Sequence, residues 1–292
     1  LTIFENNRFF PFVLQFTFGG LFSAFLIFYS RSSSFITSWP FLFILIGILI
    51  GNEMFRERYQ KLAFRLTIFF IAIFSYSVFA VPIILGRLGE WVFVLSGFLS
   101  LFLFYLVSKL FKKITSEVYQ KSKRKIFISG LVIFLLFNFF YFNNIIPPIP
   151  LSLKDIGIYH KVIRTSDGYS VQYEPAKWYQ FFKEESEIFH WHQGQPVYCF
   201  SSVFAPTDIN TNIFHLWSFF DKESGEWKKE GKLGFQISGG REAGYRGYSL
   251  KTNVWPGVWR VSVINDRGQV LGSKIFEIIE TTKLPPLKST QK

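Results

Sequence analysis

The stretch NNIIPPIPLSLKD, residues 143–155, decides how this chain is organised, because it separates two kinds of sequence. Its three prolines, Pro147, Pro148 and Pro150, cannot continue a helix and favour an extended backbone. Long apolar runs precede the stretch, whereas short segments bounded by Gly, Pro, Asn and Asp follow it. The pattern predicts a helical region at 1–142, a proline-rich linker at 143–155 and a second domain at 156–292.

The region before the linker is typical of a membrane protein. The whole chain is 49% hydrophobic and 21% aromatic, with 39 Phe among its 292 residues, which is more apolar than ordinary soluble domains are. A helix needs about 20 residues to cross a hydrocarbon core of roughly 30 Å. This requirement predicts an α-helical transmembrane bundle with about five spans, near residues 9–29, 35–51, 62–85, 91–111 and 126–142. Because the chain begins with Leu1 rather than Met, we expect a fragment or a processed chain, and the number of helices that precede Leu1 stays open.

The distribution of charge predicts the topology. The formal net charge is +12, but residues 1–149 carry 14 Lys+Arg against 5 Asp+Glu, while residues 150–292 carry 18 against 15. Loops on one side of the predicted bundle hold 11 basic residues and those on the other side hold 2. Short basic loops stay in the cytoplasm, so we expect a multi-pass protein of the bacterial cytoplasmic (inner) membrane with an extracytoplasmic C-terminal domain. The excess positive charge is then explained by cytoplasmic loops beside the bilayer, and no nucleic-acid partner is expected. The choice between periplasm and external medium for the C-terminal domain stays open.

The region after the linker predicts an all-β or mainly-β, sandwich-like domain. Its short segments are rich in aromatic and β-branched residues, and Asn265–Gly268 joins two of them in a hairpin pattern. The predicted strands lie in 196–206, 212–221, 232–240, 257–266 and 273–280. An amphipathic helix is expected near 176–189. The only cysteine, Cys199, falls within a predicted strand, where a small buried apolar residue is expected.

The glycine-rich stretch SGGREAGYRGYS, residues 238–249, is the main candidate for ligand binding. Its glycine spacing and its flanking strands match neither a dinucleotide-binding turn nor a phosphate-binding loop. Two interpretations stay open. Either the stretch is a structural loop with solvated arginines, or its arginines and tyrosines recognise an anion or a sugar, together with a nearby tryptophan. The candidate ligand-binding residues are Arg241, Arg246, Tyr245, Tyr248 and Trp255.

The same part of the chain resembles a known family. The runs VYCFSSVFAP, IFHLWSFFD, ISGGREAGYRGYS and PGVWRVSVINDRGQVLGSKIFEI, within about 185–280, resemble the C-terminal domain of a bacterial membrane-protein family, domain-of-unknown-function family 2914. The resemblance is carried by Trp217, Gly240-Arg241, Tyr245-Arg246-Gly247 and Trp259-Arg260-Val261. The run QFTFGGLFSAFLIFYS and the pair Asn52-Glu53 are similar to the membrane part often found before that domain. The resemblance implies a membrane-tethered domain and implies no activity.

Other chemistries have weaker patterns. His190, His192 and His215 are weak candidates for a metal site, without an acidic or cysteine ligand at a diagnostic spacing. Glu184, Glu185 and Glu187 could form the carboxylate pair of an envelope hydrolase, but they lie in a charged run that is ordinary for a solvated helix face. A transporter or channel would work through the helices, where Gln15 and Glu53 are the polar residues of interest.

The sequence therefore favours a binding or interaction function over an enzymatic one. We expect a membrane-anchored module whose extracytoplasmic domain binds an envelope glycan, an anionic lipid headgroup or a partner protein, with no cofactor. A transporter or channel component is the first alternative, and an envelope hydrolase is the second. The identity of the ligand and the oligomeric state stay open.

Overall fold

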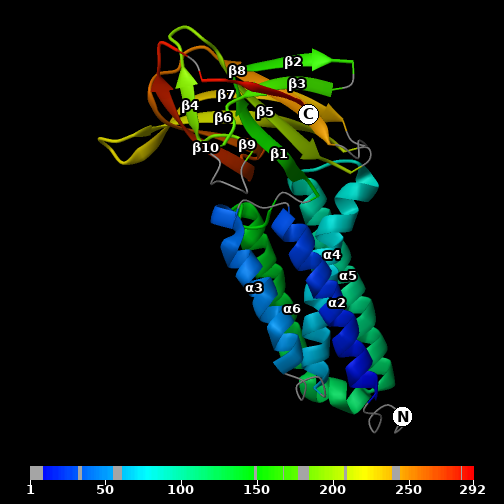
Figure 1. Cartoon of the computed structure of the whole chain (residues 1–292). Coiled ribbons are helices and arrows are strands. Elements are labelled where there is room, and N and C mark those ends of the chain that lie inside the picture. Colours follow the sequence, from blue (N-terminus) through cyan, green and yellow to red (C-terminus); the bar gives the residue numbers. More distant parts are fainter. Residues whose placement is uncertain are drawn as a thin grey trace. The chain divides into compact units, whose positions relative to one another are not determined.

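The computed structural model of the chain describes residues 9–31, 35–54, 61–147, 150–166, 168–176, 184–206, 209–238, 244–283 and 285–292. Its contacts divide the chain into two compact units, Leu1–Pro150 and Leu151–Lys292. The first unit is helical and the second consists of strands (Figure 1).

The helical unit contains the five predicted helices. They are α2 (Phe9–Arg31), α3 (Phe35–Met54), α4 (Leu62–Leu85), α5 (Glu90–Ile114) and α6 (Ser116–Phe142). Four of them, α2, α4, α5 and α6, contain segments that are long and apolar enough to cross a membrane, whereas the apolar part of α3 is the shorter Ser38–Gly51. Several apolar helices of this kind indicate a membrane protein, as the composition predicts.

The last helix is longer than its predicted span. It begins at Ser116 rather than near Ile126, so the basic run Lys121–Lys125 lies within the helix. Lys and Arg are good helix formers, and the run contains neither Gly nor Pro to end the helix. Glu117 lies in the first turn, where a negative charge interacts favourably with the helix dipole.

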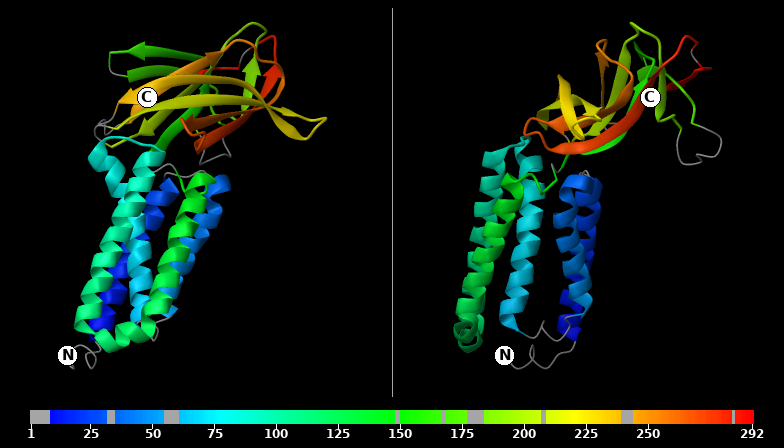
Figure 2. Two further views of the ribbon diagram at one scale, coloured as in Figure 1. Left: turned by 180° about the vertical axis from the view of Figure 1, so that it is seen from behind. Right: turned by 90° about the vertical axis from the view of Figure 1, so that its left-hand side faces the viewer.

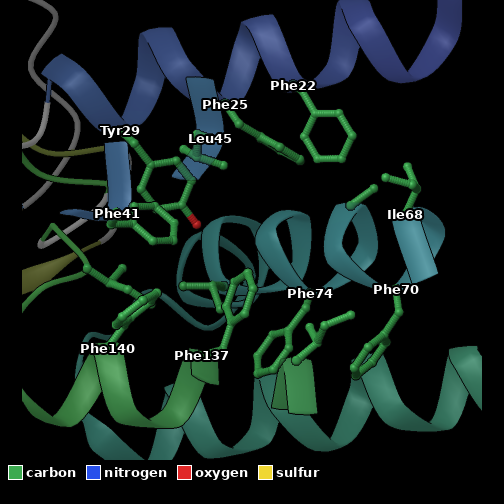
Figure 3. Packing of buried hydrophobic residues seen from close by; sticks show 14 of the residues in the cluster. Phe22, Phe25, Tyr29, Phe41, Leu45, Ile68, Phe70, Phe74, Phe137 and Phe140 are labelled. Carbon is green, nitrogen blue, oxygen red and sulfur yellow. The ribbon is translucent and has the colours of Figure 1, made fainter. Parts of the chain in front are cut away.

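Aromatic rings form the interior of the helical unit (Figure 3). The Phe74 ring of α4 stacks on Phe137 of α6 with centroids 4.4 Å apart, and Phe70 lies 4.6 Å from Phe104 of α5. Tyr29 of α2 lies 4.8 Å from Phe41 of α3. Phe41 also lies 6.1 Å from Phe137 of α6, so aromatic contacts join all five helices. This packing explains the high Phe content of this half of the chain.

Small residues let α5 approach its neighbours closely. Ser96, Gly97 and Ser100 are buried on α5, and a Cβ atom at Gly97 would lie 3.3 Å from Phe134 and 3.5 Å from Phe74. The hydroxyls of Ser96 and Ser100 donate to carbonyl oxygens of their own helix, which satisfies them without a partner on another helix. The arrangement is typical of membrane helix packing, in which small residues allow close backbone approach.

The C-terminal unit contains three sheets. One has the order β1-β5-β8, from β1 (Ser152–Tyr159), β5 (Val197–Phe204) and β8 (Tyr245–Lys251). The second has the order β4-β10-β9-β6-β7, from β4 (Ile188–Trp191), β10 (Val270–Glu280), β9 (Gly257–Asn265), β6 (Asn210–Asp221) and β7 (Glu226–Ser238). The third has the order β11-β3-β2, from β11 (Lys288–Gln291), β3 (Gly168–Tyr173) and β2 (Lys161–Thr165). Figure 2 shows the β6–β7 hairpin extending beyond the neighbouring strands.

The strand β5 is buried on both faces because each face of its sheet packs on another sheet. Cys199 contributes to a core cluster with Trp217 and Trp259 of the five-stranded sheet. The next residue, Phe200, points to the opposite face and packs with Val171 of the small sheet. Strands covered on both faces read as continuous apolar runs, which explains the segment VYCFSSVF.

The hairpin predicted around Asn265–Gly268 is confirmed. Strands β9 and β10 pair antiparallel, the N–H of Gly268 donates to the carbonyl of Asn265 at 3.0 Å, and Gly268 has a φ of +75°. Glycine adopts this left-handed conformation without a steric penalty.

The helix predicted near 176–189 is wrong in its described part. Glu185 forms a bridge with Pro175, and Ile188–Trp191 is strand β4, which pairs in parallel with Glu277–Glu280 of β10. Residues 177–183 lie outside the described residues. Pairing with a distant strand outweighs the local helical pattern here. The first strand, β1, also begins at Ser152, inside the segment expected to be a linker.

Candidate functional site

The residues expected to bind a ligand are divided between two parts of the β unit. Tyr245, Arg246 and Tyr248 lie on β8. Trp255 is instead partly buried against the core cluster of the five-stranded sheet, where its ring is 4.8 Å from Trp259 and 5.1 Å from Phe219. Arg241, Gly239 and Gly240 lie outside the described residues. Among the described candidates, the structure therefore supports a common location only for Arg246 and Tyr248, because alternation along β8 directs Tyr245 to the opposite face.

On β8, every second side chain faces away from the five-stranded sheet. Arg246, Tyr248 and Leu250 share this face, and Tyr248 and Leu250 are 40% and 45% exposed. The ring of Tyr248 has two tyrosine neighbours, Tyr169 at 6.0 Å and Tyr198 at 6.1 Å. We call Tyr169, Tyr198, Tyr248 and Leu250 the tyrosine strip.

Arg246 is already engaged within the chain. One guanidinium nitrogen, Nη1, donates to the carbonyl oxygen of Lys292 at 3.0 Å. The carbonyl of Arg246 accepts a hydrogen bond from the hydroxyl of Tyr169 at 3.3 Å. These contacts join β8 to the small sheet, so Arg246 has a structural role beside the tyrosine strip.

The three histidines considered for a metal site have separate environments. His190 pairs with Glu174, His192 is exposed and lies 3.2 Å from the carbonyl of Gln193, and His215 is fully buried. Across the described ranges, no group of three or more His, Cys, Asp or Glu side chains is arranged to hold a metal ion. The three histidines are therefore not brought together.

A buried carboxylate between two imidazoles forms a polar cluster in the β unit. Glu174 Oε1 accepts from His160 Nε2 at 2.9 Å, and Glu174 Oε2 accepts from His190 Nδ1 at 2.6 Å. The backbone N–H of His190 also donates to Oε1 at 2.7 Å. Burial acts to raise the pKa of Glu174, but these hydrogen bonds outweigh it and lower the pKa below its ordinary value. The carboxylate therefore stays ionised and holds β4 to the end of β3.

The Glu174 cluster offers one exposed imidazole. The His190 side chain is 36% exposed, whereas the His160 ring stacks on Phe189 with centroids 4.1 Å apart. A carboxylate that accepts from one imidazole nitrogen orients the other nitrogen, as in many general-base pairs. Because Glu174 accepts hydrogen bonds from two imidazoles and one backbone N–H, the geometry supports a structural clasp.

The glutamates considered for hydrolysis have different environments. Glu185 is buried, accepts from the hydroxyl of Tyr159, and lies 3.6 Å from Lys274 Nζ. Glu184 and Glu187 are exposed. Burial, and then the charge of Glu185, raises the pKa of the Tyr159 hydroxyl. The run is also not a solvated helix face, because Glu185 lies in a bridge with Pro175.

Cys199 is a buried thiol, as expected. It is fully buried, and burial raises its pKa, with a further contribution from the charge of Glu185. A thiol with a raised pKa is a poor nucleophile.

In the helical unit, the polar residue of interest in α3, Glu53, has its side chain outside the described part of the chain. Gln15 of α2 is half-buried. Neither observation assigns a transport pathway.

Sequence reasoning missed Glu174 and His160. They lie 14 residues apart, and His190 is 16 residues beyond Glu174, so no short motif connects them. The available signal was a lone acid before Pro175 at the end of a predicted strand, which is too common to be diagnostic.

Comparison with solved structures gives only low similarity. An immunoglobulin-like protein from Pseudomonas aeruginosa aligns at 11% identity and a TM-score of 0.26, covering 44% of this chain and 96% of its own. An alkylpurine DNA glycosylase from Pseudomonas fluorescens aligns at 12% identity and a TM-score of 0.23, and the alignment covers 42% of this chain and 30% of the glycosylase. A beta-glucosidase from Listeria innocua aligns at 9% identity and a TM-score of 0.23, and the alignment covers 42% of this chain and 16% of the glucosidase. No curated protein sequence matches this chain.

A family model matches the C-terminal region. The matched residues are 210–278, which run from the start of β6 to β10 and include Trp217, Arg246 and Trp259. The match confirms the resemblance predicted from the sequence. Residues 210–278 of this chain match the family described as "Protein of unknown function (DUF2914)".

Proposed function

We propose that this protein is a membrane-anchored binding module. Its five helices, α3 included, span the bacterial cytoplasmic membrane, and its sandwich-like β domain binds an envelope glycan on the extracytoplasmic side. Packing of β1-β5-β8 and the five-stranded sheet around one core supports the sandwich interpretation.

The membrane arrangement is supported by the helices and their charges. The helix α3 has 20 residues and carries Trp39, an aromatic residue that suits the membrane interface, near its N-terminal end. With α3 counted as a span, the number of spans is odd, and the basic residues of α5 and α6 lie at cytoplasmic ends. Because α6 begins on the cytoplasmic side and crosses the membrane once, the β domain that follows it lies on the extracytoplasmic side.

The exposed ring of Tyr248 is the observation that carries the glycan assignment. Tyrosine rings offer a large, rigid and amphipathic contact surface, on which the apolar face of a sugar ring can stack. In the tyrosine strip, Leu250 extends this surface along β8, and two flanking tyrosines hold the Tyr248 ring. Because Arg246 is engaged with Lys292, the strip suits a neutral sugar better than an anion.

The test uses the full chain in phosphatidylcholine nanodiscs, titrated with a neutral N-acetylglucosamine hexamer. We expect the double variant Tyr248→Ala, Leu250→Ala to bind about tenfold more weakly, which corresponds to about 1.4 kcal/mol. The matched control is Ile163→Ala, Leu233→Ala, which removes side chains of 46% and 42% exposure elsewhere. No binding by the wild-type chain, or equal losses in both double variants, would contradict the assignment.

A further inference from the structure

The outward face of the five-stranded sheet differs from the rest of the β unit in its combination of charge and aromatic rings. Register and alternation place Trp217 and Trp259 on the core side, so the residues beside them in sequence point outward. We call this set the outer sheet face. It comprises Phe214, Leu216, Ser218 and Phe220 of β6, Trp227, Lys229 and Lys232 of β7, Arg260 of β9, and Ile275, Glu277 and Ile279 of β10.

Among the described residues, Arg260 is held on this face without an anionic partner. Its guanidinium carbon Cζ lies 4.2 Å from the centroid of the Trp227 ring. The Nε atom is buried and has no hydrogen-bond partner among the described residues. Within the same residues, no acidic side chain lies within ion-pair distance of Arg260. A partly desolvated guanidinium that is stacked on an indole ring is oriented to accept a carboxylate or a phosphate.

Two lysines extend the positive charge across β7. Lys229 and Arg260 both face Ser218 of β6 in register, one from each side. Because β6 lies between β7 and β9, the backbones at Lys229 and Arg260 are two strand spacings apart, which is about 10 Å. The ammonium of Lys232 lies 3.9 Å from the centroid of the Phe214 ring. Charges at such separations match a ligand with repeated anionic groups better than a single small anion.

Apolar side chains lie on both sides of these charges. Ile275 is opposite Arg260 in register and is 49% exposed. The rings of Phe220 and Trp227 lie 5.2 Å apart beside Lys229. Glu277 is the acidic member of the outer sheet face, on β10 opposite Val258. The basic side chains therefore gather toward β7, together with the aromatic rings.

We propose that the outer sheet face binds an acidic polysaccharide. Uronate carboxylates pair with Arg260, Lys229 and Lys232, while the apolar faces of the sugar rings lie against Trp227, Phe220 and Ile275. Basic side chains beside apolar ones on the protein match the carboxylates and rings that such a polymer carries together. This site goes beyond the tyrosine strip, because it uses a different sheet and a ligand of different charge.

The test measures binding of an oligogalacturonate to the full chain in phosphatidylcholine nanodiscs. The variant is Lys229→Gln, Lys232→Gln, Arg260→Gln. The matched control, Lys161→Gln, Arg164→Gln, Lys288→Gln, removes the same number of positive charges, all of them exposed, from the small sheet. We expect the first triple variant to bind about tenfold more weakly or worse, and the control to bind within about twofold of the wild type.

Two further probes separate the possible causes of binding. Neutral dextran should not bind at the outer sheet face, and polyphosphate should bind more weakly than oligogalacturonate because it lacks sugar rings. The proposal is overturned if the two triple variants lose affinity equally, since binding would then follow net charge alone. Equal affinity for polyphosphate and oligogalacturonate would overturn the polysaccharide assignment in favour of a general polyanion site. A circular dichroism melt of each variant confirms that it is folded.

Discussion

His215 shows how a single polar residue is kept inside an aromatic core. Its Nε2 lies 2.7 Å from the Ser201 hydroxyl and its Nδ1 lies 2.8 Å from the Ser249 hydroxyl. The indole N–H of Trp217 also donates to Ser249 at 3.1 Å. Both ring nitrogens therefore have partners, and burial lowers the pKa of His215 to about 4. The imidazole stays neutral in the folded protein.

This lowered pKa predicts a dependence of stability on pH. Between pH 6.5 and about 4 the unfolded chain takes up a proton at His215 and the folded chain does not, so stability falls as the pH falls through this window. We expect His215→Gln to remove this part of the pH dependence, which amounts to at most about 3 kcal/mol. Thermal unfolding of the full chain in nanodiscs, followed by tryptophan fluorescence from pH 7 to 4, measures it.

His192→Gln is the control for this prediction, because His192 is exposed. The pKa of Glu174 lies below the ordinary 4.5 in the folded chain, so its contribution to stability is present above pH 4.5 and is lost as the pH falls below that value. A His215→Gln protein whose stability falls as steeply as that of the wild type between pH 6.5 and 4 would contradict the prediction.

At the scale of elements, β7 and β8 approach each other where β8 carries a glycine. A Cβ atom built at Gly247 would lie 2.6 Å from the Phe235 ring of β7. The same ring lies 5.2 Å from His215 of β6. Gly247 therefore leaves room for the Phe235 ring, which covers the buried His215. Packing thus explains why a glycine stands at this position of the family-matched segment.

We expect Gly247→Ala to destabilise the β unit by about 1–3 kcal/mol, because overpacking forces the Phe235 ring to move. Gly231→Ala is the matched control in β7, since its nearest neighbour, Lys251 Nζ, lies at an ordinary contact distance of 3.6 Å. Chemical denaturation of both variants gives the comparison. Equal stabilities would show that the close approach of β7 and β8 has no energetic consequence.

At the scale of the whole molecule, an apolar helical unit and a separate β unit share one chain. The helices bury phenylalanine rings against each other, whereas exposed apolar side chains such as Phe16, Trp91 and Phe127 suit contact with lipid. The β unit has its own core and its own polar clusters. The helical unit therefore has an apolar surface that suits lipid, and the β unit has a separate core of its own.

The proposed topology predicts which cysteines react in spheroplasts. We expect Lys222→Cys, at the exposed tip of the β6–β7 hairpin, to be labelled by a membrane-impermeant maleimide without lysis. The wild-type chain is the control, because Cys199 is fully buried and burial raises its pKa. Labelling of Lys222→Cys only after lysis would reverse the assigned side of the membrane.

The sequence by itself determined the features that depend on neighbouring residues. Long apolar runs predicted all five helices, and Asn265–Gly268 predicted the hairpin between β9 and β10. Both signals are local, because helix formation and tight turns depend on residues a few positions apart. The motif match at 210–278 is also a property of the linear sequence.

Only the tertiary structure decided which polar groups meet. Glu174 joins two histidines from different segments, Arg260 of β9 stacks on Trp227 of β7, and Arg246 binds the carbonyl of Lys292. The helix expected near 176–189 gave way to β4 because β10 supplied a pairing strand. These outcomes depend on strand order and register between distant segments, which local residue patterns do not specify.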